Sequence, residues 1–388
     1  GIVVTMNPEW KIYEHGFVAI RDGRIVEVGD ATLLGTRSYR PAEEIDARAK
    51  VVLPGLVNSH THIPMVLFRG LADDLEEQDE EHAEDDKEDG AGEGEGAAGR
   101  ARHHLNQAIA ACGLAHASRR RCAARTGRIR GTGHDIVNHC VNDVLVQRAY
   151  PLFFLDYLAS SKIDAEMVAE VVGGMADACA AAGCVLLGGE TAEMPGVYSP
   201  GAFDIAGTLV GVAEREQLLP LPTITAGDVL IGVASNGPHT NGYSYLRKLF
   251  AWIPLESQPV PLDRPLVEAL LEPHRNYLPV LKDALNTELV KALVHITGGG
   301  LPENMPRVLP QGIGANITLG SWPMPPLFQL VSELSALEMN ELYRTLNMGI
   351  GMVVIVAPQH VEAVQASISE QTWIIGELTS DHNKVLLQ

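Results

Sequence analysis

Three glycine-rich runs in the second half of the chain combine small residues with carboxylate, amide and imidazole side chains. They are residues 188–196 (GGETAEMPG), 235–244 (SNGPHTNGYS) and 295–301 (HITGGGL). Glycine lets backbone N–H groups approach an anion closely, and carboxylate oxygens are ligands that Mg²⁺ prefers. The runs therefore predict a site that cradles phosphates and an accompanying metal ion.

A different chemistry is indicated near the N-terminus, in residues 58–62 (NSHTH). Side chains alternate along a strand, so His60 and His62 lie on the same face and suit one metal ion, Zn²⁺ or Fe²⁺. Two imidazoles alone make a weak site, because a stable transition-metal centre needs further ligands.

The composition bounds the class of protein. The 388 residues suffice for two or three domains, and 46% of them are hydrophobic. No apolar stretch is long enough to span a bilayer, and no basic leader precedes the first apolar run, so we expect neither a membrane partner nor a secretory signal. The five cysteines form no CxxC pair, which favours reduced thiols and a cytoplasmic location.

The formal charge of −20 is unevenly spread. Residues 76–95 hold twelve acids and one lysine, which argues against a nucleic-acid partner. Residues 100–130 hold eight arginines. An arginine cluster can bind RNA or phosphate, but we favour a poorly ordered stretch that the acidic tract neutralises. Residues 76–122 are therefore interpreted as a low-complexity junction.

Patterns elsewhere predict short strands and helices. Residues 17–20 and 24–28 flank Asp22-Gly23, a hairpin signal. Residues 164–182 have helical spacing and end at Gly183, a plausible C-cap. Strands are expected at 151–157 and 184–187, and a second domain opens at about residue 228. Strands that alternate with helices indicate an α/β or α+β class.

From about residue 123 to 388 the chain resembles the aminoimidazole ribonucleotide synthetases, the phosphoribosylformylglycinamidine cyclo-ligases of purine biosynthesis. The resemblance rests on six runs in the family's order: residues 141–147 (VNDVLVQ), 151–157 (PLFFLDY), 188–196, 235–244, 295–310 and 343–352. It implies a two-domain α/β fold with an incomplete N-terminal, ATP-binding domain at 123–217 and a C-terminal domain at 218–388. It also implies a homodimer.

The family's reaction is an ATP-dependent ring closure of formylglycinamidine ribonucleotide, in which the amide oxygen is phosphorylated before an internal nitrogen attacks. With ATP and Mg²⁺ implied as cofactors, Asp143 and Glu190 are expected to contact the metal. His239 is expected to act as acid or base, or to contact phosphate. Phosphate or substrate contacts are expected from Asn142, Gly188, Gly189, Thr191, Asn241, Gly298, Gly299 and Gly300.

Two departures from this family stand out. Arg148 occupies a position that is usually glycine. Nothing in the chain matches the Gly-Thr-Asp-Gly-Val-Gly-Thr-Lys type motif that supplies Asp and Lys to the metal and the ATP phosphates.

Residues 1–75 resemble a second family, the amidohydrolase-superfamily deaminases of the methylthioadenosine/S-adenosylhomocysteine type, through residues 54–62 (PGLVNSHTH) and 68–74 (FRGLADD). That family takes further metal ligands from later barrel strands, which do not follow here. Three functions stay open: a purine-biosynthesis ligase, a Zn²⁺- or Fe²⁺-dependent deaminase, and an inactive fusion product that keeps a dimerising fold.

Overall fold

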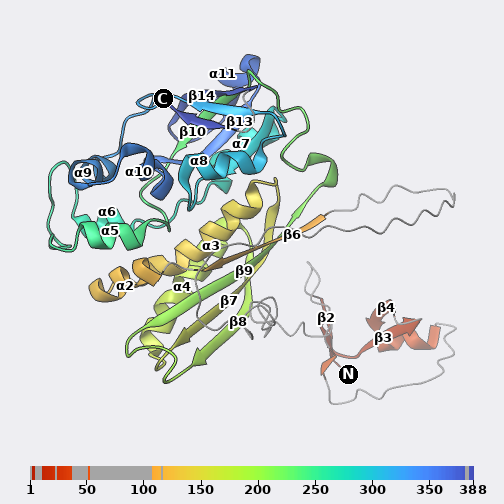
Figure 1. The fold of residues 1–388 in the computed structure, drawn as a ribbon. Helices are drawn as coiled ribbons and strands as arrows, with labels where there is room; N and C mark the ends of the chain where they lie inside the picture. Colours follow the sequence, from red (N-terminus) through yellow and green to blue (C-terminus); the bar gives the residue numbers. More distant parts are fainter. Residues whose placement is uncertain are drawn as a thin grey trace, which may run out of the picture. The chain divides into compact units, whose positions relative to one another are not determined.

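The computed structural model describes residues 2–4, 11–21, 24–36, 51–52, 107–114, 117–380 and 384–388. The chain divides into two compact units, Gly1–Ser59 and His60–Gln388, which are considered separately (Figure 1). The predicted metal ligands His60 and His62 and the acidic tract lie outside the described residues.

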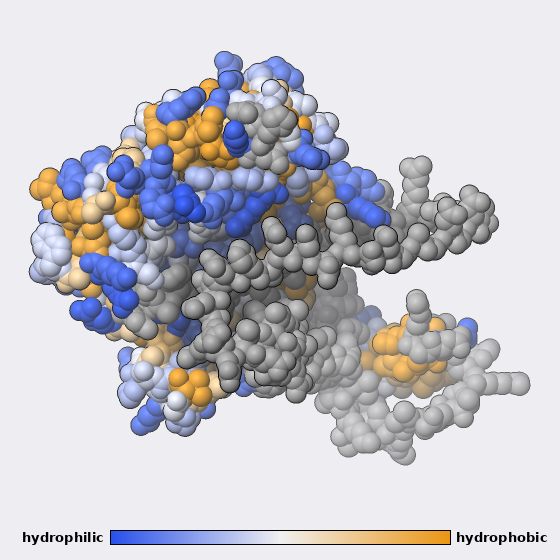
Figure 2. Space-filling view, viewed as in Figure 1, coloured by the Kyte–Doolittle hydropathy of each residue, from blue (hydrophilic) through white to orange (hydrophobic). Residues whose placement is uncertain are grey.

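The first unit is built from short strands. β1 (Ile2–Val4) pairs with β2 (Ile12–Tyr13) and β5 (Val51–Val52), and a 3-10 helix, η1 (Ala31–Thr36), follows β4. β3 (Gly16–Arg21) and β4 (Arg24–Asp30) pair antiparallel and confirm the predicted hairpin. Ile20 and Ile25 face each other across this hairpin and are 67% and 59% exposed. Figure 2 shows the resulting hydrophobic surface over β3 and β4.

The second unit begins with a four-stranded sheet in the order β6 (Gln107–Leu114), β9 (Phe203–Ala213), β7 (Tyr150–Ser160) and β8 (Val185–Glu193). Helices α3 (Arg130–Leu145) and α4 (Ala165–Ala182) pack against each other and cover one face of this sheet (Figure 1). The α4 caps agree with the sequence: Asp164 accepts bonds from two backbone N–H groups, and Gly183 has φ 72°. A left-handed residue at this position is the usual helix terminator.

The start of this sheet differs from the predicted boundary at residue 123. β6 pairs along its whole length with β9, and α2 (Ala117–Thr126) follows it, so both elements lie within the stretch interpreted as a junction. Arg119 and Arg120 are buried rather than part of a poorly ordered stretch. The arginines belong to the fold because buried or half-buried carboxylates, Asp135 and Asp204, pair with them.

The rest of the unit forms a six-stranded, mostly antiparallel sheet in the order β11, β13, β10, β14, β12, β15. The strands are β10 (Val229–Ala234), β11 (Val290–His295), β12 (Gly314–Ile317), β13 (Ile350–Val356), β14 (Thr372–Thr379) and β15 (Val385–Leu387). The helices are η2 (Arg215–Gln217), α5 (Tyr243–Leu249), α6 (Leu266–Leu271), α7 (Leu278–Asn286), α8 (Gly300–Asn304), η3 (Met305–Val308), α9 (Pro326–Leu334), α10 (Met339–Thr345), η4 (Pro358–His360) and α11 (Val361–Ala366). The expected mixture of helices and strands is confirmed.

One hydrophobic core joins the two sheets. It contains Val137 of α3 and Phe154 of β7 together with Ile231 of β10 and Leu281 of α7. A second core lies on the other face of the six-stranded sheet and includes Phe328 of α9. Helix α3 is therefore held between the two sheets, so its polar residues lie at a domain interface. Among the described helices, none is long and apolar enough to cross a membrane.

Candidate active site

Polar side chains of α3 meet the irregular segment at residues 272–277. Asn138 donates to the carbonyl of His274 at 2.7 Å. Asn142, which is fully buried, donates to the carbonyl of Arg275 at 2.8 Å and accepts from the backbone N–H of Tyr277 at 2.9 Å. The Asn142 amide, expected to contact phosphate or substrate, is thus engaged by backbone and fixes this segment to α3.

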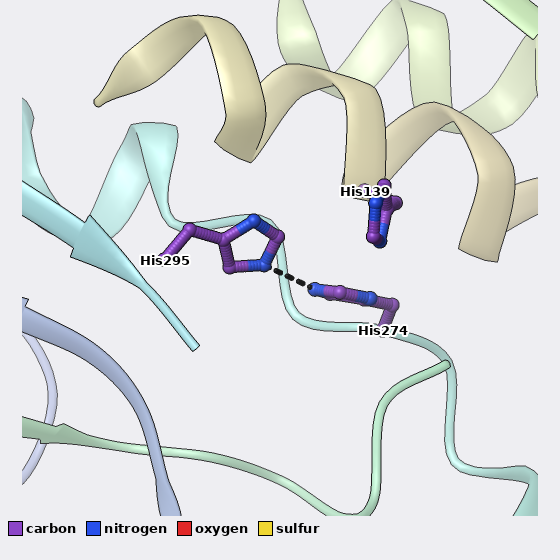
Figure 3. A group of neighbouring side chains, drawn as sticks. All are labelled: His139, His274 and His295. Atoms are coloured by element: carbon purple, nitrogen blue, oxygen red, sulfur yellow. Dashed lines mark hydrogen bonds between the residues drawn. The ribbon is translucent and has the colours of Figure 1, made fainter. Parts of the chain in front are cut away.

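Five side chains next to these contacts form a closed ring of polar interactions. Asp143 Oδ1 lies 2.8 Å from His295 Nδ1, and Asp143 Oδ2 lies 3.2 Å from His139 Nε2. His295 Nε2 is 3.1 Å from His274 Nε2. Thr240 Oγ1 closes the ring, at 3.4 Å from His274 Nδ1 and 3.1 Å from His139 Nδ1. Figure 3 shows the three imidazoles converging from α3, from the 272–277 segment and from the end of β11.

Burial and hydrogen bonding set the charges of this ring. Burial lowers the pKa of His274 well below the ordinary value and also lowers the pKa of His295. Burial opposes ionisation of Asp143, but the hydrogen bonds from His139 and His295 outweigh it and hold the pKa of this carboxyl below its usual range. At neutral pH the ring therefore contains a carboxylate and neutral His274 and His295.

His239 lies against this ring in a constrained turn. Its φ of 58° is uncommon for a residue other than glycine, and its side chain is fully buried. Its imidazole stacks on His274 with a centroid distance of 4.1 Å, and Nε2 lies 3.0 Å from Asn236 Oδ1. His239 Nδ1 has no hydrogen-bond partner among the described residues, and burial lowers the pKa of the ring well below the ordinary value. A buried, unpaired nitrogen in a strained turn is typical of a binding site.

The glycine triplet continues from His295 and lies beside Asn241. Gly299 and Gly300 have φ of 90° and 59°, and a side chain on Gly300 would place its Cβ 1.8 Å from the carbonyl oxygen of Tyr343. Only glycine fits there. A Cβ on Gly298 would lie 3.4 Å from Asn241 Oδ1, and Asn241 Nδ2 has no partner among the described residues. The predicted turn is confirmed, and the Asn241 amide beside it has an unused donor.

Two family models cover this fold: "AIR synthase related protein, N-terminal domain" over residues 108–213, and the C-terminal domain of the same description over residues 225–387. The chain belongs to the AIR synthase-related family. The expected resemblance over the C-terminal two thirds is confirmed, and the match from residue 108 agrees with β6 as the first strand of the N-terminal domain. The resemblance of residues 1–75 to deaminases stays a prediction.

Curated relatives carry the name phosphoribosylformylglycinamidine cyclo-ligase. The chain is 45% identical over 265 residues to that of Alkaliphilus metalliredigens, a match that covers 66% of this chain and 75% of the relative. It is 49% identical over 252 residues to that of Geobacillus kaustophilus, covering 63% and 73%. Among solved structures, thiamine-monophosphate kinase from Stenotrophomonas maltophilia is similar in fold, with a TM-score of 0.54, 15% identity and coverage of 73% and 85%.

The AIR synthase-related N-terminal domain holds the remaining predicted residues in a strand. Gly188, Gly189, Glu190 and Thr191 lie in β8, opposite Leu155 to Leu158 of β7. A Cβ on Gly189 would lie 2.1 Å from the Asp156 carbonyl oxygen, so strand packing requires this glycine. The structure thus gathers Asp143, His239, Asn241 and residues 298–300 at α3, and it places residues 188–191 on the outer strand of the four-stranded sheet.

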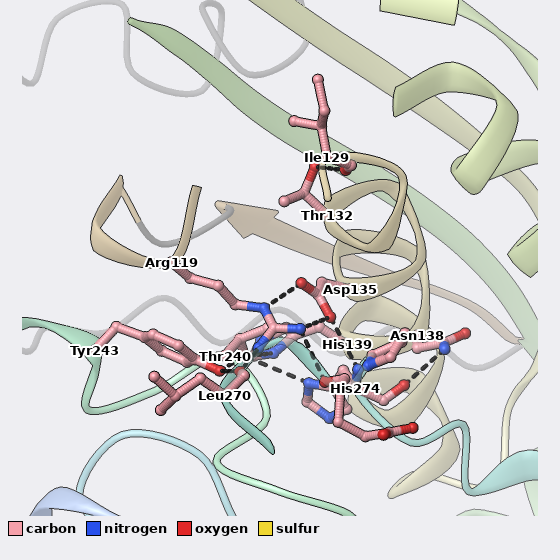
Figure 4. Close-up of polar contacts among 12 residues, drawn as sticks. Arg119, Ile129, Thr132, Asp135, Asn138, His139, Thr240, Tyr243, Leu270 and His274 are labelled. Carbon is pink, nitrogen blue, oxygen red and sulfur yellow. Dashed lines mark hydrogen bonds and ion pairs between the residues drawn. The ribbon is translucent and has the colours of Figure 1, made fainter. Parts of the chain in front are cut away.

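Sequence reasoning did not single out Arg119, which organises the same interface (Figure 4). Its guanidinium pairs with Asp135, contacts the Tyr243 hydroxyl, and donates to the carbonyls of Leu270 at 2.6 Å and Glu272 at 2.9 Å. Asp135 Oδ1 also accepts from the backbone N–H of His274 at 2.9 Å. The pair therefore positions His274.

His139 and His274 were also missed as site residues. The i, i+4 spacing of His139 and Asp143 on one helix was a usable signal, because such residues lie on one face. His274 had none, since its position depends on long-range contacts with α2 and α3.

Proposed function

We propose that this chain catalyses the ATP-dependent cyclisation of formylglycinamidine ribonucleotide to aminoimidazole ribonucleotide in purine biosynthesis. Membership of the AIR synthase-related family and relatives of 45–49% identity with the cyclo-ligase name support this activity. The observation that carries it is the assembly of Asp143, the His239–Asn241 turn and the Gly298–Gly300 loop at one interface.

Asp143 is suited to contact Mg²⁺. Its side chain is 32% exposed, and each carboxylate oxygen engages one imidazole and keeps a second lone pair. Mg²⁺ usually keeps several waters and binds one or two protein carboxylates, so Asp143 alone fits that requirement, and Glu190 on β8 is retained as a separate candidate. When bound, the MgATP complex supplies the phosphoryl group that turns the amide oxygen into a leaving group.

The residues of the turn and the loop are proposed to hold the nucleotide substrates. The unpaired Asn241 Nδ2 is a donor that lacks a partner until a ligand arrives, and the adjacent glycines leave space for an anion. His239 Nδ1 is likewise unpaired, and we propose that this nitrogen bonds substrate or exchanges a proton with it. Gly188, Gly189 and Thr191 are retained as proposed contacts from the N-terminal sheet.

The test is ADP release by the purified chain with ATP and Mg²⁺, with and without formylglycinamidine ribonucleotide. We expect release that depends on this substrate, and a loss of about 10²-fold or more in kcat/KM for Asp143→Asn. Lys248→Ala, a change on the exposed face of α5, is the matched control and should leave the rate unchanged. Absence of substrate-dependent ADP from a chain with native circular dichroism would favour the inactive fusion product.

We also propose a homodimer that forms through the outer strand β8. Val185 and Leu187 are 59% and 40% exposed, whereas Leu186 between them packs on the core. Such an apolar stripe on an edge strand suits a second copy of the chain. Sedimentation of the wild type and of Val185→Lys/Leu187→Lys tests this, because the charged variant should sediment as a monomer. Cys122, Cys179 and Cys184 are free thiols, which supports a cytoplasmic location.

A further inference from the structure

The three imidazoles of the ring place nitrogen atoms where a metal ion would bind. One ligand nitrogen from each of His139, His274 and His295 lies within 4.8 Å of the others. The closest pair, His274 Nε2 and His295 Nε2, is 3.1 Å apart. Two nitrogens bound at 2.0–2.1 Å in tetrahedral geometry lie about 3.3 Å apart, so this pair is close to the required separation.

The contacts with Asp143 select which nitrogen of each imidazole can bind an ion. The Asp143 carboxylate only accepts, so hydrogen lies on His295 Nδ1 and His139 Nε2 in these two contacts. The other ring nitrogens, His295 Nε2 and His139 Nδ1, point away from the carboxylate, and His295 Nε2 lies next to His274 Nε2.

The surroundings of the three imidazoles suit a metal ion. Burial disfavours a charged imidazole at His274 and His295. Asp143 stands behind both His139 and His295, the arrangement in which a carboxylate fixes the tautomer of a metal-binding histidine and raises its basicity. The His139 side chain is 21% exposed, so an ion can enter from its side and keep an open coordination position.

We propose that His139, His274 and His295 bind a divalent transition-metal ion of the Zn²⁺ type, with Asp143 orienting two of the three ligands. Imidazole ligands select Zn²⁺, Co²⁺ or Ni²⁺ over Mg²⁺, so this site differs in chemistry from the phosphate-associated Mg²⁺ proposed above. The ion would link α3 to the 272–277 segment and to β11, and would stabilise the domain interface.

The experiment measures metal binding by the full chain and needs no turnover, so its outcome is independent of the ligase activity. Chelator-treated protein is titrated with Co²⁺, followed by visible absorption of tetrahedral Co²⁺, and with Zn²⁺ by calorimetry. The background is His60→Ala/His62→Ala, which removes the other histidine pair. We expect one ion per chain, and a rise in Tm of about 3–5 °C at a 100-fold excess of Zn²⁺ over Kd. Millimolar Mg²⁺ should not compete.

Variants decide whether these residues are the ligands. His139→Ala and His139→Met should each weaken binding by about 100-fold or more, and Asp143→Asn by about 10- to 100-fold. His134→Ala, on the same helix, is the matched control and should bind as the background does. Unchanged Co²⁺ spectra and Zn²⁺ affinity in both His139 variants would overturn the proposal, as would a His60→Ala/His62→Ala background protein that binds no Co²⁺ at this stoichiometry.

Discussion

Replacing Arg119 tests whether the buried arginine holds the domain interface together. Arg119→Met keeps most of the side-chain volume but leaves Asp135, which is 1% exposed, without its cationic partner. It also removes the donors to the carbonyls of Leu270 and Glu272. Breaking a buried pair on one side costs about 3–5 kcal/mol, because an uncompensated charge stays in the interior. We expect the free energy of unfolding to fall by that amount.

The assay is urea unfolding followed by circular dichroism at neutral pH. Arg128→Met is the control, because Arg128 is 44% exposed and its ion pair with Glu268 should contribute about 0–1 kcal/mol. The double variant Arg119→Met/Asp135→Asn should recover part of the loss, since no buried charge is left unpaired. A loss below about 1 kcal/mol for Arg119→Met would refute the reasoning that this pair fixes the interface.

Three further substitutions probe strain, packing and charge. Gly351→Ala would place a Cβ 2.5 Å from the His239 ring. We therefore expect the free energy of unfolding in urea to fall by about 1–3 kcal/mol and ADP release to decrease. A variant as stable as the wild type would contradict the close packing of Gly351 against His239. Glu288 is exposed and has a φ of 59°, a left-handed conformation that glycine adopts without strain, so Glu288→Gly should raise the free energy of unfolding by about 0.5–1 kcal/mol. The control, Glu333→Gly within α9, should lower the free energy of unfolding by about 1 kcal/mol. If both substitutions changed stability in the same direction, the backbone at Glu288 would not be strained. Burial raises the pKa of Asp156 to about 6, above its unfolded value, so its ionisation destabilises the folded state as pH rises from about 4 to 6. Asp156→Asn should be more stable than wild type by about 1–3 kcal/mol at pH 8 and equal to it near pH 4, and a pH-independent difference would exclude this cause.

Local sequence rules predicted elements whose stabilising contacts are themselves local. The hairpin around residues 22–23 and the α4 cap at Gly183 depend on residues a few positions apart, and both were predicted. β6 was missed because its small apolar residues carry little signal alone and its pairing partner, β9, lies about a hundred residues later. Both Gly188 and Gly189 lie in strand β8, and at Gly189 the Asp156 carbonyl lies too close for a side chain, a packing requirement that the sequence alone did not indicate.

The candidate site shows the same division between local and long-range information. The family motifs named Asp143, His239 and Asn241 because each lies within a characteristic run. Their partners are distant in sequence: His295, the first residue of another such run, is 152 positions from Asp143, and His274, which lies in none of the runs, is 131 positions away. His274 carries no periodic signal, so only the packing of α3 against the C-terminal domain identifies it.

The segment at residues 272–277 explains why the site requires both domains. It has no regular secondary structure between α6 and α7, so side chains from elsewhere must satisfy its backbone groups. Those side chains are Arg119 of α2, Asp135, Asn138 and Asn142 of α3, and Asn236. Four of the five belong to the N-terminal domain, yet the segment they hold carries His274, on which His239 stacks. Separating the two domains would therefore disorder this segment, whereas the strand pairing within each sheet would remain.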